Sequence, residues 1–206
     1  MANLNAPFGL APIRSLQSDK YNGAGTRYYI PSTDTLAYYV GDLVLSAAAA
    51  DTNGVSGVIK AIAGTETYRG VITGVENPAT QAVSIQGNPL SLETTNIPAT
   101  KAVAYYVYVV DDPLVLFKCQ GDATTTNQVA TKANNNCSFS ITAGSPAAPS
   151  VVASATVINS STIATTSSLS GKLMGLLQVP NNTFGAYGIY QVKLNLHEFL
   201  GATAGV

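Results

Sequence analysis

The feature that most constrains the fold is a succession of short runs rich in Val, Ile, Leu and Tyr, each stopped by Gly, Pro, Asn or Asp. Such runs are typical of β-strands, because β-branched and aromatic side chains pack well on a pleated surface. They lie at residues 28–30, 36–40, 43–46, 55–62, 68–75, 82–86, 102–110, 114–120, 137–142, 172–179 and 187–197. Strands at this spacing predict an all-β protein, either a β-sandwich or a jelly-roll-like barrel.

Two of these runs also indicate how the strands are buried, since successive side chains of a strand point to opposite faces. In residues 102–109 both faces are apolar, which predicts a central strand or one covered by a partner. In residues 187–197 one face carries Val192 and Leu194, whereas the other face is polar and ends at His197. This run predicts a strand with one solvent-exposed face, and it predicts that His197 is a surface or interface residue.

The chain divides into an arm and one domain. Residues 1–20 carry isolated apolar side chains with neither a helical nor a strand period, which predicts an extended N-terminal arm lying on its own domain or on a neighbour. Residues 21–206 are expected to form the β-sandwich domain, with a Ser/Thr/Ala-rich excursion at about 143–170 that holds one or two weak strands. The alanine run at 47–50 is stopped by Asp-Thr-Asn-Gly and predicts a turn between strands.

Composition favours a function within an assembly. Charged residues make up only 10% of the chain, whereas hydrophobic residues reach 46%. Typical soluble domains carry about 25% charged residues, so Thr, Ser, Asn and Gln must form most of this surface. A surface of this kind repels a second protein weakly and costs little to desolvate when it packs against one.

The charge pattern argues against two kinds of partner. The net charge is −1 and the Lys and Arg residues are scattered, whereas a nucleic-acid-binding protein needs a basic stripe. The N-terminus lacks the cationic and apolar regions of a signal peptide, and no window holds 18 uninterrupted apolar residues. We therefore expect neither a nucleic-acid partner nor a membrane partner.

The sequence offers no catalytic, cofactor or metal site. Its single histidine, His197, excludes mechanisms that need two histidines and leaves a Ser/His/Asp site with one possible base. One histidine and two widely spaced cysteines cannot complete a structural zinc site, and we expect Cys119 and Cys137 to be separate buried thiols. The sequence DDP at 111–113 pairs two carboxylates, but between two strands it predicts a turn. We therefore expect a protein that is not an enzyme.

Several segments taken together resemble a family of virion structural proteins of tailed bacteriophages. They are NAPFGLAPIR at 5–14, YVGDLV at 39–44, RGVITG at 69–74, DDP at 111–113 with FKCQ at 117–120, and the region 175–197. The resemblance implies a cement or decoration protein of β-sandwich or jelly-roll fold, made in the host cytoplasm and placed on the outer capsid surface. Its partners would be the major capsid protein and further copies of itself, as a dimer or trimer. Where the family opening carries Arg before the second proline, this chain has Ala11.

The resemblance also implies where the contacts would lie. The arm would reach onto a neighbouring subunit, and the predicted capsid or oligomer interface consists of Phe8, Leu10, Ile13, Arg14, Tyr28 and Tyr29. Deleting residues 1–16 would then abolish capsid binding and leave the domain folded. Two alternatives stay open: a receptor-binding or glycan-binding module that uses tyrosines on an exposed sheet, and another head or tail component of the virion.

Overall fold

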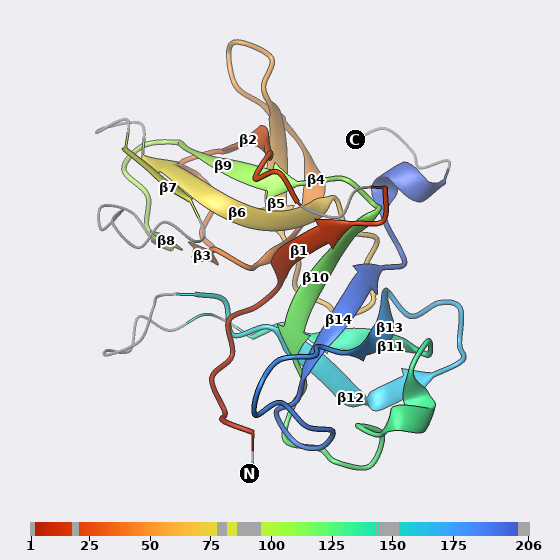
Figure 1. Ribbon diagram of the computed structural model, residues 1–206. Helices are drawn as coiled ribbons and strands as arrows, with labels where there is room; N and C mark the ends of the chain where they lie inside the picture. The colour runs from red at the N-terminus through yellow and green to blue at the C-terminus, as the bar shows by residue number, and fades with distance from the viewer. Residues whose placement is uncertain are drawn as a thin grey trace.

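The structure, a computed structural model, describes residues 3–17, 21–77, 82–85, 96–142, 144 and 153–201. Within these ranges the regular elements are strands, apart from two short 3₁₀ helices, η1 (Ala130–Lys132) and η2 (Glu198–Leu200). The predicted all-β fold is therefore confirmed. The strands form two large packed sheets, of which one closes on itself into a barrel (Figure 1).

The barrel occupies the upper half of the molecule in Figure 1. It consists of β2 (Thr26–Ile30), β4 (Leu43–Ala50), β5 (Ser56–Lys60), β6 (Gly70–Asn77) and β9 (Tyr105–Val110). These strands pair in the order β4-β5-β2-β9-β6, and β6 pairs back onto β4, so the ring is closed. β2 and β5 are parallel, the other pairs are antiparallel, and β7 (Ala82–Ile85) pairs with β6 outside the ring. The interior is filled by apolar side chains, among them Tyr28, Ile30, Val44, Val58, Ile72, Val75, Val107 and Val109.

The open sheet forms the lower half of the molecule. Its order is β1 (Ala11–Ser15), β10 (Val115–Gln120), β14 (Ile189–Leu194), β13 (Gly171–Leu176), β11 (Asn136–Ser140) and β12 (Val157–Ala164), and all pairs are antiparallel. A separate two-stranded ladder pairs β3 (Tyr38–Tyr39) with β8 (Asn96–Ile97), and both strands come from the part of the sequence that forms the barrel sheet. The predicted central position of residues 102–109 is confirmed, because β9 lies between β2 and β6.

A shared core joins the barrel to the open sheet. Leu43 and Val71 of the barrel strands belong to the same buried cluster as Phe117 and Leu173 of the open sheet. Tyr68, which precedes β6, packs edge-on against Phe139 of β11 with ring centroids 6.0 Å apart. The two sheets therefore bury apolar area against each other, and this burial is the main term that holds them together.

The alanine run was predicted wrongly as a turn. Residues 47–50 belong to β4, where Ala47 pairs with Gly57 and Ala50 pairs with Ser56 of β5. Gly57 permits this pairing, because a Cβ atom there would stand 2.7 Å from the carbonyl oxygen of Ala49. The turn lies one step later, where the Asp51 carboxylate accepts backbone hydrogen bonds and closes the hairpin.

The arm is more firmly attached than the sequence indicates. Residues 3–10 run along the molecule without regular structure, but Ala11–Ser15 is the edge strand β1 of the open sheet (Figure 1). Its register against β10 shifts between Pro12 and Arg14, which marks a β-bulge. The Leu10 N–H donates to Gly41 O at 3.0 Å, and a Cβ atom at Gly9 (φ +71°) would overlap this same oxygen. Residues 11–15 therefore belong to the sheet and not to a separate arm.

The prediction for residues 187–197 is confirmed for the strand and wrong for His197. Val192 and Leu194 are buried as expected, but His197 is only 3% exposed. The chain leaves the sheet after Leu194, and the His197 ring accepts the Phe199 N–H at the start of η2. Burial is the main cause that lowers the pKa of His197 to about 4.

Three further predictions concern the cysteines, the 143–170 excursion and the turn at 111–113. Cys119 and Cys137 are buried free thiols, as expected, and burial raises the pKa of both. The 143–170 excursion contains β12 and its residues 143 and 145–152 lie outside the described part of the chain. Asp112 accepts the Leu114 N–H at 2.8 Å, so the 111–113 sequence forms a turn between β9 and β10.

Candidate interaction surfaces

The structure does not bring the six predicted interface residues into one surface. Leu10 is fully buried in the core that the two sheets share, and Tyr28 is 2% exposed inside the barrel. The Tyr28 hydroxyl donates to Asp111 at 2.7 Å and accepts from Arg69, and burial raises the pKa of Tyr28 to about 12. Neither Leu10 nor Tyr28 can contact a partner, so both assignments to an interface were wrong.

The other four residues keep some exposure. Phe8 is half-buried below the Lys118 ammonium group, which lies 5.3 Å from the ring centroid. Ile13 is half-buried and Arg14 is exposed at the bulge of β1. Tyr29 lies on the outside of the barrel and belongs to a different surface.

A buried amide holds the N-terminal segment against the end of the open sheet. Gln120, the last residue of β10, is 2% exposed. Its side chain donates to Leu4 O at 2.8 Å and to Tyr187 O at 3.2 Å, and it accepts the Ala6 N–H at 3.1 Å. Since Leu4 and Tyr187 lie at opposite ends of the sequence, one side chain fixes two distant segments together.

Two asparagines fix the shape of the neighbouring loop, residues 177–188. Asn182 donates to Leu177 O and Ile189 O at 2.7 and 2.8 Å and accepts the Ile189 N–H, which closes the loop at its base. Asn3 donates to Thr183 O and to Ala186 O, both at 2.9 Å. The loop is therefore held from inside and from the N-terminal segment.

The same loop stores backbone strain. Asn181 and Tyr187 have φ values of 63° and 61°. For a bulky residue such as tyrosine this left-handed region is rarely occupied, and it persists only where surrounding contacts enforce it. The hydrogen bonds of Gln120 and of the Tyr187 N–H to Asp122 O, 3.0 Å long, provide that enforcement.

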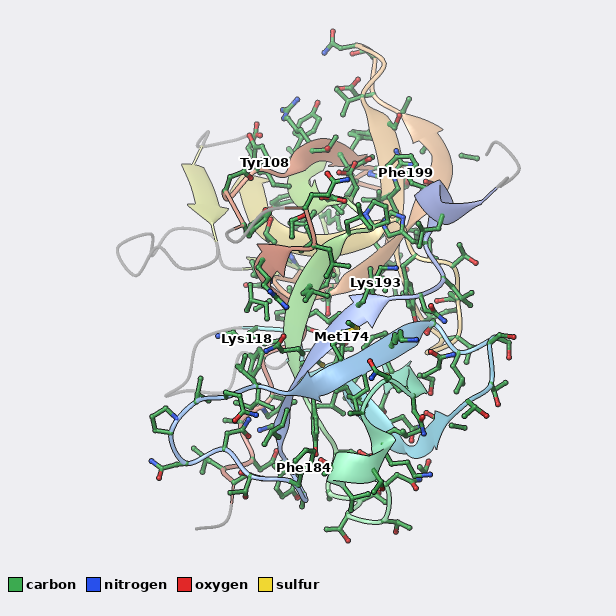
Figure 2. The ribbon with its side chains drawn as sticks, turned by 45° about the vertical axis from the view of Figure 1, so that its right-hand side comes forward. Tyr108, Lys118, Met174, Phe184, Lys193 and Phe199 are labelled. Atoms are coloured by element: carbon green, nitrogen blue, oxygen red, sulfur yellow. The ribbon has the colours of Figure 1, made fainter. Side chains whose placement is uncertain are left out.

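Residues 3–9 and 177–188 together form what we call the uncharged end of the molecule. Neither segment contains a charged residue. Leu4, Val179 and Phe184 are 79%, 42% and 40% exposed on it, and Figure 2 labels Phe184 at the extremity opposite the barrel. The N-terminal segment and the loop, both fixed by hydrogen bonds, thus expose apolar side chains to solvent. A preformed docking surface has this property.

The amide contacts of this end were not predicted. Gln120, Asn3 and Asn182 act across long sequence separations, so no local pattern identifies them. One signal was readable, since no charged residue occurs between Lys172 and Lys193. The pair Asn181-Asn182, with Gly185 and Gly188 a few residues later, also indicates a structured turn.

A second surface, which we call the tyrosine face, lies on the outside of the barrel. Strand register places Tyr29 of β2 opposite Tyr106 of β9, and Tyr106 opposite Glu76 of β6. Arg27 and Tyr108 form the next row of the same face. The Tyr29 and Tyr106 ring centroids are 5.9 Å apart. Figure 2 labels Tyr108 of this face.

Ionic hydrogen bonds lock the tyrosine face. Arg27 binds Glu76 through two bonds of 2.9 Å and stacks on the Tyr106 ring, with its guanidinium carbon 3.4 Å from the centroid. Tyr108 donates to Glu76, and Tyr106 donates to Asp51 at 2.7 Å. The Arg27 hydrogen bonds lower the pKa of Glu76, and the hydrogen bond to Asp51 raises the pKa of Tyr106.

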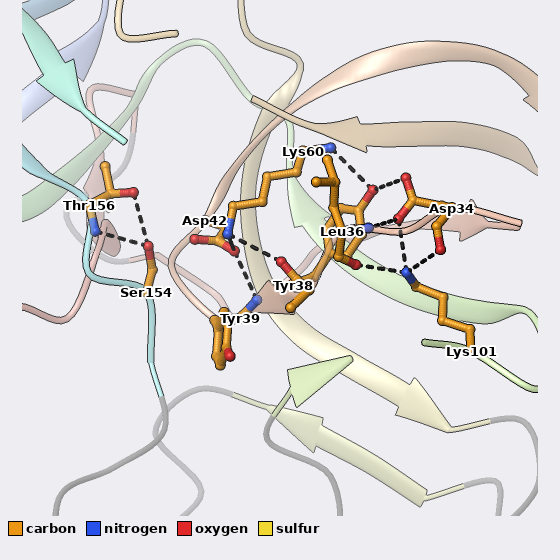
Figure 3. A network of polar contacts seen from close by, with 10 residues as sticks. Asp34, Leu36, Tyr38, Tyr39, Asp42, Lys60, Lys101, Ser154 and Thr156 are labelled. Atoms are coloured by element: carbon orange, nitrogen blue, oxygen red, sulfur yellow. Dashed lines mark hydrogen bonds and ion pairs between the residues drawn. The ribbon is translucent and has the colours of Figure 1, made fainter. Parts of the chain in front are cut away.

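Two buried ion pairs lie close together beside β3 (Figure 3). Lys60 reaches Asp42 at 2.6 Å, and Lys101 reaches Asp34 at 2.8 Å. The Tyr38 hydroxyl connects them, because it donates to Asp34 and accepts the Lys60 N–H. The two ion pairs are therefore internal contacts of the fold, and only Asp42 Oδ1 among these charged atoms is buried without a hydrogen-bond partner.

The structure offers no grouping typical of a metal centre: among the described residues no three His, Cys, Asp or Glu side chains are placed to hold an ion. No helix of the described ranges is long and apolar enough to span a membrane. Comparisons with protein family models, with curated proteins and with solved structures found no match.

Proposed function

We propose that this chain is a non-enzymatic structural protein of a tailed-bacteriophage virion, which binds the outer capsid surface and bridges neighbouring major-capsid subunits. The resemblance of the segments at 5–14, 39–44, 69–74 and 175–197 to such proteins supports the proposal. A protein that binds the assembled shell more tightly than free subunits stabilises the shell by mass action. Closed symmetry, as a dimer or trimer, would repeat each contact.

The observation that carries the proposal is the uncharged end. Desolvating an unpaired ion costs roughly several kcal/mol, and no side chain of residues 3–9 and 177–188 is charged; Lys118 lies beside this end, over the Phe8 ring. Because Gln120 and Asn182 already hold the loop, binding orders few additional side chains. Leu4 and Phe184 supply the apolar contact.

The test is co-sedimentation of the purified protein with DNA-filled heads that lack it. The variants Leu4→Glu and Phe184→Glu are expected to reduce binding at least tenfold, because each places a charge in the contact. Ile62→Glu is the matched control, since Ile62 is a 74% exposed aliphatic residue outside the uncharged end. Unchanged binding of both variants, or equal loss in the control, would contradict the proposal.

Point variants test capsid binding better than the deletion of residues 1–16. That deletion would remove the fully buried Leu10 and the strand β1, so loss of binding could reflect loss of the fold. Leu4 and Phe184 lie on the surface, and a thermal unfolding curve verifies that each variant remains folded.

A further inference from the structure

The tyrosine face has the architecture of a binding site and not of a casual surface. Its tyrosines and its arginine come from β2 and β9, and its carboxylates come from β6 and from the β4–β5 turn, so four elements contribute side chains to this face. The barrel beneath is closed and its interior is filled, which makes the face rigid. We propose that the tyrosine face binds an uncharged carbohydrate.

The rings provide the apolar part of the site. A sugar ring presents a face of C–H groups that packs on an aromatic ring, and tyrosine combines such a ring with a polar tip. Tyr29, Tyr106 and Tyr108 are each half-exposed. The hydroxyls of Tyr106 and Tyr108 are held by Asp51 and Glu76, so these two rings lose little freedom when a ligand arrives.

The polar groups retain hydrogen-bonding capacity toward hydroxyl groups. Arg27 uses Nε and one Nη N–H on Glu76, and a guanidinium has five N–H donors, so further donors remain. Tyr106 and Tyr108 donate their protons to carboxylates, which leaves lone pairs on both phenol oxygens as acceptors. Both donors and acceptors are therefore present beside the rings, and the hydroxyl groups of a sugar can use both.

The charges of the face disfavour an anionic ligand. Arg27 contributes one positive charge against the negative charges of Glu76 and Asp51, so an anionic polymer gains no net attraction. Arg27 covers one face of the Tyr106 ring, so a sugar would pack mainly on the half-exposed rings of Tyr29 and Tyr108. A neutral polyhydroxylated chain matches the rings and the hydrogen-bonding groups without needing a charged partner.

The experiment is affinity electrophoresis of the full chain in native gels. The gels contain dextran, mannan or galactan as neutral polysaccharides, and alginate as the anionic comparison. At least one neutral polysaccharide is expected to retard the protein. Tyr106→Ala and Tyr108→Ala should each weaken the retardation at least tenfold in apparent affinity, and Arg27→Gln should weaken it less. Phe199→Ala is the control, because Phe199 is a 53% exposed aromatic residue of η2, outside this face.

Three outcomes overturn the proposal. Retardation by none of the neutral polymers, or by alginate alone, rejects the ligand class. Retardation that survives Tyr106→Ala and Tyr108→Ala in folded protein rejects the site. Unchanged retardation together with loss of head binding in these variants would instead identify the face as a protein interface. Since Leu4→Glu and Phe184→Glu leave this face intact, failure here and failure of the capsid proposal can be distinguished.

Discussion

The barrel and the open sheet solve the problem of buried polar groups in different ways. The four ion pairs found within the described residues all involve barrel strands or the segments next to them. In the open sheet the buried polar side chains are mostly amides and hydroxyls, such as Gln120, Gln128 and Ser138. The difference teaches that one half of the molecule depends on ionisation for its stability, whereas the other half depends on neutral hydrogen bonds and leaves its end without charge.

The largest effect is expected when the barrel loses a buried cation. Lys60→Met leaves the fully buried Asp42 carboxylate without its partner, and breaking one side of such a pair costs about 3–5 kcal/mol. The measurement is urea unfolding at neutral pH. Burial already raises the pKa of Asp42, so the deficit should shrink on acidification as the carboxyl takes up a proton.

A matched control separates the pair from general loss of a lysine. Lys132→Met, at a half-buried lysine of η1 outside the four ion pairs, is expected to change stability by less than about 0.5 kcal/mol. The double variant Asp42→Asn with Lys60→Met should recover part of the loss. A Lys60→Met variant as stable as the parent would show that the pair contributes little to the barrel.

A smaller effect is expected where the two halves meet. The unfolded state binds a proton to His197 below pH 6.5, whereas the folded state binds it only below about 4. Stability contributed by neutral His197 is therefore complete above pH 6.5 and is lost as the pH falls toward 4. We expect a loss of about 2 kcal/mol over this range, which allows for partial solvent access.

The variant His197→Gln isolates this contribution. Its stability should fall less than that of the parent between pH 6.5 and 4, because the other titrating groups are unchanged. The measurement is the difference between the two proteins in urea midpoint at each pH. Parallel pH profiles for both proteins would refute the assignment.

The smallest effect on stability is expected in the open sheet. Gln120→Leu leaves Leu4 O and Tyr187 O without their donor, which costs about 1–2 kcal/mol in thermal or urea unfolding. Because no charge is involved, this loss should not vary between pH 5 and 8. Asn127→Leu is the control, since Asn127 bonds a single carbonyl, that of Ser160. A pH-dependent loss in Gln120→Leu would remove the contrast between the two halves.

The strands could be predicted because each depends on its own residues. The β14 run shows its burial through alternation alone, and the structure confirms it at Val192. The two apolar faces of the β9 run predict a central strand, and β9 lies between β2 and β6, although Tyr106 and Tyr108 on its outer face are half-exposed. The contacts that place the N-terminal segment could not be predicted in this way. The Leu10 N–H bonds Gly41 O and Leu4 O is bonded by Gln120, and each partner is far away in the sequence. The sequence predicted tyrosines on an exposed sheet as one alternative and named Tyr29, but it did not predict which rings join Tyr29, since the register that aligns Tyr29 with Tyr106 is a property of the folded barrel.

The edge strand β1 has a consequence for behaviour at high concentration. A free strand edge is a template on which identical chains can add strands and grow into fibres. Pro12 offers no N–H to such an incoming strand, and the bulge before Arg14 bends the edge out of register. Many copies of this protein can therefore be crowded together while this side of each sheet resists amyloid-like polymerisation.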